Sequence, residues 1–175
     1  MAFLQIDYKS EALMRGVNIK VILPSDGMAG KWEPPYKTLY LLPGYSATAT
    51  ELITYLGLRG QSELKGIAIV LPDGENLFYQ DLPDRMTFYS TYVGKELVEV
   101  TRKMLPLSTK REDTFIGGIS MGGYGALYNG FKYRDTFSKV VAFSPASDAY
   151  MLLAEEDAPG FSRKQFEGIF GSKEA

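Results

Sequence analysis

The 175 residues of the chain contain neither histidine nor cysteine. Without cysteine the chain forms no disulfide and offers no thiolate to a metal ion. Without histidine, a zinc or iron site would consist of carboxylates alone, a ligand set that these metals rarely have in proteins. The sequence therefore predicts a protein that uses no metal and no other cofactor.

Long apolar runs and basic clusters are also missing. No apolar stretch approaches the ~20 residues that span a bilayer. The segment Met1–Ser10 lacks the basic and apolar regions of a signal peptide. These absences favour a cytoplasmic protein that does not associate with membranes. A formal net charge of −2 and the lack of any run of Lys or Arg argue against a nucleic-acid partner.

The residues that are present have the composition of a globular protein, with 45% hydrophobic and 23% charged residues. A chain of this length buries a sizeable core. No linker and no internal repeat divides it, so we expect a single domain over residues 1–175.

Short apolar runs alternate with segments of helical periodicity. Strands are predicted at Phe3–Tyr8, Asn18–Leu23, Lys37–Leu42, Gly66–Leu71, Thr114–Ile119 and Lys139–Phe143. Helices are predicted at Ala49–Leu64, Gly94–Leu105, Gly122–Tyr133 and Ser162–Phe170. The alternation predicts an α/β fold, with a mostly parallel sheet, helices on both faces and the first two strands as an antiparallel hairpin at one edge. The last four strands are continuously apolar, which is typical of strands covered on both faces.

The pattern Gly118-x-Ser120-x-Gly122 lies where a predicted strand meets a predicted helix. In this context the pattern is typical of a nucleophilic serine held on a sharp turn, where side chains at the two glycine positions would collide. Helix N–H groups after the serine favour the negative charge that develops on an attacked carbonyl oxygen. The alternative is a glycine-rich turn with an incidental serine, but the flanking strand and helix favour the catalytic interpretation.

The segment Leu41–Ser46 follows the third predicted strand. In hydrolases with such a serine, this loop supplies one backbone N–H of the oxyanion hole, and the residue after the nucleophile supplies the other. Tyr45 and Met121 are therefore the predicted donors. The alternative is a Pro-Gly turn that only closes a strand. Because the loop precedes the serine motif in the expected order, we favour the oxyanion role.

A serine hydroxyl needs a neighbouring base, usually an imidazole, to take its proton. The chain has the predicted nucleophile, Ser120, but no histidine. Asp148 is the carboxylate that chain order places best for a catalytic triad, but without histidine it is expected to be a loop residue. We also expect Asp73 to hold a loop by accepting backbone N–H bonds, and the aromatic segment 88–93 to belong to the core rather than to an acyl pocket.

Four segments of the chain resemble the esterase D family of α/β-hydrolases, and more narrowly the bacterial tributyrin esterases. They are Met1-Ala-Phe-Leu-Gln-Ile-Asp-Tyr8, Tyr92-Val-Gly-Lys-Glu-Leu97, Gly117-Gly-Ile-Ser-Met-Gly-Gly-Tyr-Gly-Ala126 and Phe137-Ser-Lys-Val-Val-Ala-Phe-Ser144. The resemblance covers essentially the whole chain. It implies an α/β-hydrolase fold and hydrolysis of short-chain acyl esters, with Ser120 as nucleophile and the N–H groups of Met121 and Tyr45 as oxyanion donors.

The chain departs from the family in two ways. It has Pro43-Gly44 where family members usually carry His-Gly. The family's catalytic Asp and His follow further C-terminal strands, so the resemblance implies that these 175 residues are a partial domain without those strands. By itself, such a chain is expected to be nearly inactive. Its last strand would keep an unpaired edge, which favours a homo-oligomer or poor solubility.

Other functions stay open at this point. The lack of histidine leaves room for a non-catalytic binding protein with the same fold. An acyltransferase forms the same acyl-enzyme and differs only in the acceptor. An S-formylglutathione hydrolase is a further relative with the same chemistry.

Overall fold

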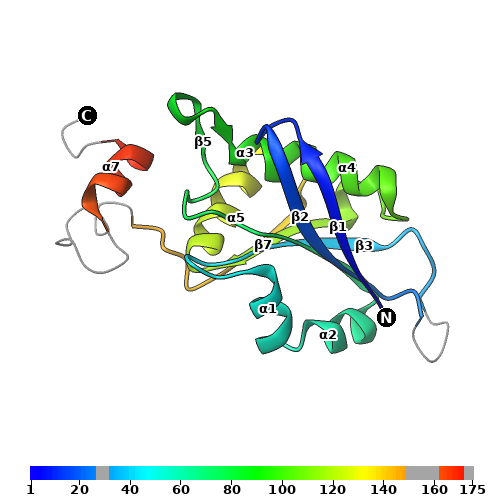
Figure 1. The fold of residues 1–175 in the computed structure, drawn as a ribbon. Helices are drawn as coiled ribbons and strands as arrows, with labels where there is room; N and C mark the ends of the chain where they lie inside the picture. Colours follow the sequence, from blue (N-terminus) through cyan, green and yellow to red (C-terminus); the bar gives the residue numbers. More distant parts are fainter. Residues whose placement is uncertain (27–31, 149–161, 172–175) are drawn as a thin grey trace.

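The computed structural model describes residues 1–26, 32–148 and 162–171 (Figure 1). Its centre is a six-stranded sheet with the strand order β1-β2-β4-β3-β7-β8. The strands are β1 (Ala2–Ser10), β2 (Arg15–Leu23), β3 (Lys37–Leu42), β4 (Ile67–Pro72), β7 (Thr114–Ile119) and β8 (Lys139–Phe143). Strands β4, β3, β7 and β8 are parallel, whereas β1 and β2 form an antiparallel pair at one edge. The mostly parallel sheet and the edge hairpin are confirmed.

Helices lie on both sides of this sheet (Figure 1). The α-helices of the described residues are α1 (Ala49–Tyr55), α2 (Leu58–Lys65), α3 (Tyr89–Thr91), α4 (Leu97–Met104), α5 (Met121–Lys132) and α7 (Arg163–Phe170), of which α7 lies beyond the end of the sheet. A small second sheet pairs β5 (Asp81–Leu82) with β6 (Thr87–Phe88). Within the described ranges, no helix has the length and apolar character needed to cross a bilayer.

The core has one layer on each face of the sheet. Tyr40 and Leu42 of β3 belong to the larger layer, together with Leu97 of α4 and Ala126 of α5. Leu41, the residue between them, belongs to the smaller layer under α1 and α2. Alternate residues of one strand are therefore buried on opposite faces, which explains the continuously apolar sequence of β3.

The structure corrects two predicted helices. The helix predicted over Ala49–Leu64 is two helices, because Gly57 adopts a left-handed conformation (φ 58°) between α1 and α2. A single glycine destabilises a helix by only ~1 kcal/mol, so its presence in the sequence does not by itself predict that a helix ends there. The helix predicted to begin at Gly94 begins earlier, because α3 continues through a π-helical turn at Tyr92–Glu96 into α4.

Strand β8 is another correction, because it is not covered on both faces by the described residues. Val141 is 44% exposed and Phe143 57% exposed. Helix α5 covers one face, where Val140 lies against Gly130. The other face is open and borders an apolar groove of about 480 Å³ that runs from Leu56 to Phe143. The apolar sequence of β8 suits a buried strand, but no described helix lies over this face.

Candidate functional site

Ser120 lies on a sharp turn between β7 and α5. Its backbone has a φ of 54° and a ψ of −116°, a conformation that a serine rarely adopts. Three backbone hydrogen bonds hold it. The Ser120 N–H donates to the carbonyl of Phe143 at 2.9 Å, and the Ser120 carbonyl accepts from the N–H groups of Tyr124 at 3.0 Å and Ala146 at 3.1 Å. The turn is therefore fixed by β8 and the segment after it, as well as by α5.

The glycines on either side of Ser120 are required by close backbone contacts. A side chain on Gly118 would collide with the carbonyl of Gly122, as the sequence pattern predicts. A side chain on Gly122 would collide with the carbonyl oxygens of Leu42 and Pro43. We expected a side chain on Gly122 to collide across the turn, but the contact is with the end of β3. Gly122 therefore allows α5 to approach the loop that follows β3.

The loop after β3 lies directly beside the serine. A Cβ atom built on Gly44 would be 3.6 Å from the Cβ of Ser120. Tyr45 is the next residue of this loop, and Met121 is the first residue of α5 and is buried. The first N–H groups of a helix have no partner within the helix. The three site residues predicted from the sequence, Ser120, Met121 and Tyr45, are thus brought to one end of the parallel strands.

An aromatic cluster extends from this loop, and the sequence did not identify it. The buried ring of Phe78 lies at its centre, with ring centroids 6.4 Å from Tyr45, 5.6 Å from Tyr124, 5.7 Å from Phe166 and 5.0 Å from Phe170. Tyr124 is one turn along α5 from Ser120, so the cluster forms an apolar wall close to the serine. Its members come from four separate segments, and only their aromatic character marks them in the sequence.

The hydroxyl of Tyr124 is a polar group within this apolar wall. The Tyr124 hydroxyl accepts a hydrogen bond from the side-chain nitrogen of Gln80 at 2.7 Å. Burial raises the pKa of Tyr124 above its ordinary value, and the bond from Gln80 opposes this rise only in part. The phenol therefore stays neutral at physiological pH.

Two of the other segments considered in the sequence support the fold, and the third, at Asp148, is exposed. Tyr89, Tyr92 and Val93 are buried in the larger core layer, as we expected for segment 88–93. The Asp73 carboxylate accepts from the N–H of Ala49 at 2.6 Å and so holds the start of α1, which confirms its predicted role. Asp148 is exposed in the segment after β8.

The arrangement combines a hydroxyl group with backbone N–H groups at a helix start. This suits attack on a carbonyl carbon and binding of the resulting oxyanion. Among the residues that the structure describes, no side chain forms a hydrogen bond with the Ser120 hydroxyl. The same residues include no group of three potential metal ligands.

Comparison with known proteins gives one family. A family model described as "Putative esterase" matches residues 10–165. An acetyl esterase of Caldicellulosiruptor saccharolyticus is 40% identical over 151 residues, which are 83% of this chain and 57% of that protein.

Two solved structures from Staphylococcus aureus are similar over nearly the whole chain. The fluorophosphonate-binding serine hydrolase F, with substrate bound, has a TM-score of 0.83 at 31% identity, and the match covers 97% of this chain and 66% of that one. The S-formylglutathione hydrolase FrmB, as apoenzyme, has a TM-score of 0.79 at 29% identity, and the match covers 95% of this chain and 66% of that one. The chain thus spans less than two thirds of the length of these three relatives.

The close contact at Gly122 makes a prediction about stability. Replacing Gly122 with Ala should destabilise the protein by about 1–3 kcal/mol, because the new methyl group overlaps the carbonyls at the end of β3. Gly60→Ala is the matched control, since Gly60 lies within α2 with open space around its Cα, and it should stabilise the helix by ~0.5–1 kcal/mol. Urea unfolding of both variants measures the two effects. Equal stability of Gly122→Ala and the wild type would refute the contact.

Proposed function

Because the chain belongs to the esterase family of α/β-hydrolases, we propose that it is the larger part of a serine carboxylesterase that hydrolyses short-chain acyl esters. The observation that carries this proposal is the strained backbone of Ser120, at the junction of β7 and α5 and beside the Gly44–Tyr45 loop. A strained conformation that several hydrogen bonds maintain is typical of a functional residue.

In the proposed reaction, the Ser120 Oγ attacks the ester carbonyl carbon while its proton passes to a base. The carbonyl oxygen becomes an oxyanion, which accepts hydrogen bonds from the N–H groups of Met121 and Tyr45. Each such donor contributes ~10²–10³-fold to the rate in comparable enzymes. When this tetrahedral intermediate collapses, the base gives its proton to the leaving alcohol, and an acyl-enzyme remains. Water then attacks this acyl group by the same route and releases the acid.

The base is proposed to lie outside the 175 residues, which contain no histidine. The relatives are longer, since the matches cover only 57–66% of their lengths. We propose that residues 1–175 are a partial α/β-hydrolase domain, and that a histidine and its carboxylate partner come from additional sequence.

The substrate is proposed to be a small, uncharged acyl ester, as in tributyrin esterases. The aromatic cluster around Phe78 offers an apolar wall to an acyl chain. The 40%-identical relative is named an acetyl esterase, which supports a short acyl group. An S-formylglutathione hydrolase is the second candidate within the same chemistry, because one structural relative has that name.

The lack of histidine favours one alternative from another class, a non-catalytic protein that binds a ligand with the same fold. It differs from the esterase in a single measurable property, the reactivity of Ser120. An acyltransferase would share that reactivity and differ only in the acceptor.

A fluorophosphonate probe tests the reactivity of Ser120. In the full-length protein we expect rapid labelling of Ser120, which Ser120→Ala abolishes. The 175-residue chain should react far more slowly, because no imidazole is present to take the serine proton. The outcome is read by mass spectrometry of the labelled peptide. A folded full-length protein that takes up no label at Ser120 would favour the binding protein.

We also propose that the 175-residue chain forms homo-oligomers through β8. The strand lies at the sheet edge and exposes Val141 and Phe143 on one face, which makes it a template for association. Sedimentation equilibrium should show a mass above that of one chain, and Val141→Lys should shift the population toward the monomer. Phe131→Lys, which changes an exposed apolar residue of α5, is the control and should have no such effect. A monomeric wild-type chain would contradict this proposal.

A further inference from the structure

The loop that contains Tyr45 is held on both sides by one short segment, residues 76–79. On the N-terminal side, the Tyr79 hydroxyl donates to the carbonyl oxygen of Pro43 at 2.8 Å. On the C-terminal side, the N–H of Ser46 donates to the side-chain oxygen of Asn76 at 2.8 Å. Tyr45 lies between these two anchored positions, and its ring contacts Phe78 of the same segment.

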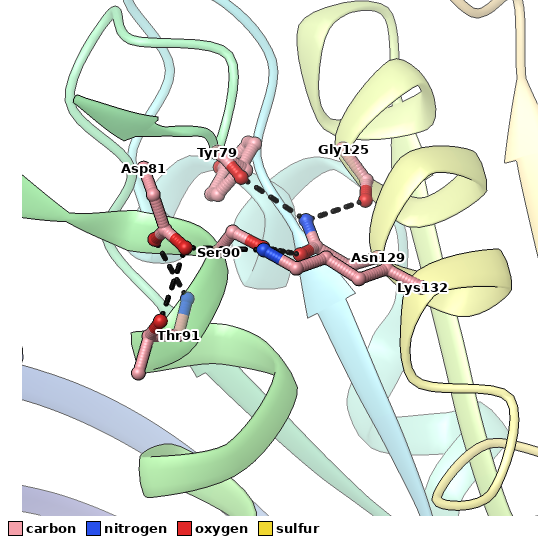
Figure 2. Close-up of polar contacts among 7 residues, drawn as sticks. All are labelled: Tyr79, Asp81, Ser90, Thr91, Gly125, Asn129 and Lys132. Carbon is pink, nitrogen blue, oxygen red and sulfur yellow. Dashed lines mark hydrogen bonds and ion pairs between the residues drawn. The ribbon is translucent and has the colours of Figure 1, made fainter.

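Tyr79 is itself fixed firmly to α5. Its side chain is fully buried, and any side chain at Gly74 or Gly125 would overlap its ring. Its backbone carbonyl accepts from the Asn129 side-chain nitrogen at 3.1 Å, and the same nitrogen donates to the Gly125 carbonyl at 2.9 Å (Figure 2). The ring and the backbone of Tyr79 therefore both rest on the helix that begins at Met121.

A polar network orients Asn129 for this contact (Figure 2). The Ser90 hydroxyl donates to the Asn129 side-chain oxygen at 2.7 Å. The Ser90 oxygen in turn accepts from Lys132 Nζ at 2.8 Å, and Lys132 also pairs with Asp81 at 3.1 Å. Because its oxygen is occupied by Ser90, Asn129 presents its nitrogen to Tyr79. The amide orientation is thus set by a chain of specific partners.

The segment also has an unusual backbone. Both Phe78 and Tyr79 have a φ of 56°, and neither is glycine. Such conformations persist only where the surroundings determine them strongly, and they gather at functional sites. Asn129, on one side, and Pro43, on the other, are the partners that hold Tyr79 in this conformation.

We propose that Tyr79 and Asn76 are positioning residues, which fix the N–H of Tyr45 relative to the N–H of Met121. This inference rests on the proposed function, in which these two groups bind the oxyanion. Met121 begins α5, Tyr79 is attached to α5, and Tyr79 and Asn76 hold the loop on either side of Tyr45. Segment 76–79 therefore connects the two proposed halves of the oxyanion hole, in addition to the direct contact of Gly122 with the end of β3.

The chemistry of the tyrosine suits this role. Complete burial raises the pKa of Tyr79 well above its ordinary value, with nearby Tyr89 and Asp73 adding to the effect. The hydroxyl therefore keeps its proton at physiological pH and can donate to the carbonyl oxygen of Pro43.

Tyr79→Phe in the full-length enzyme removes only the hydroxyl and keeps the ring between Gly74 and Gly125. For a short-chain aryl ester we expect kcat to fall about tenfold or more, up to the ~10²–10³-fold that loss of an oxyanion donor costs. The KM should change less than about twofold, because the ground-state carbonyl depends little on these donors. Tyr40→Phe is the matched control, since that buried hydroxyl bonds to Thr101 at 2.9 Å, remote from the loop.

A boronic acid that forms a tetrahedral adduct with Ser120 provides a second readout. Its inhibition constant should rise in Tyr79→Phe by about the same factor as kcat/KM falls, because both report binding of the tetrahedral oxygen. The Tyr40→Phe control should lose similar thermal stability and keep both its kcat and its boronate affinity. A purely structural role of Tyr79 would give the two variants the same behaviour.

Asn76→Ala tests the other anchor without a buried change, because Asn76 is exposed. It should also lower kcat and boronate affinity, and amide hydrogen exchange at Ser46 should become faster. Asn18→Ala, which removes a side-chain hydrogen bond to Asp7 on the β1–β2 hairpin, is its control. Asn76→Ala also keeps the inference testable if Tyr79→Phe does not fold.

The outcomes separate the inference from the function. Full-length wild-type protein without Ser120-dependent turnover would overturn the proposed esterase. An active wild type whose Tyr79→Phe and Asn76→Ala variants keep the kcat and boronate affinity of their controls would overturn the positioning role alone. Loss of kcat and boronate affinity in either variant, with KM nearly unchanged, supports it.

Discussion

The geometry of Ser120 depends on hydrogen bonds between its own backbone and the outermost strand of the sheet. Its N–H donates to Phe143 at the end of β8, and its carbonyl accepts from Ala146 just beyond. A φ of 54° costs a serine ~1–3 kcal/mol, so the conformation persists only while these partners are in place. The pairing of β7 with β8 therefore determines where the hydroxyl lies.

The same end of the sheet shows how little of the proposed site is made of polar side chains. Close approach of α5 to β3, which Gly122 permits, brings the start of the helix beside the Gly44–Tyr45 loop. Backbone N–H groups are the proposed oxyanion donors, and aromatic rings form the neighbouring wall. Side-chain chemistry is confined to Ser120 and to the residues that hold the backbone in position. The 175 residues contain no histidine that could take the proton of Ser120.

Local sequence signals explain what was predictable. Strands β3 and β7 match their predicted bounds, because each is a short apolar run with clear limits. Ser120 was identified because its glycines lie within two residues of it. Tyr79 was missed because its bond to Pro43 joins residues 36 positions apart, and no periodicity marks the segment. The open face of β8 was also missed, since its composition is that of a covered strand and exposure depends on which elements lie over it.

In the proposed mechanism, Ser120 carries the acyl group during turnover. The direct measurement is acid quenching of the full-length protein within one turnover of 4-nitrophenyl butyrate, followed by intact mass and fragmentation of the modified peptide. The proposed mechanism predicts one butyryl group per chain, bound to Ser120 and absent from Ser120→Ala. Turnover that leaves Ser120 unmodified, or a butyryl group on another residue, would contradict it.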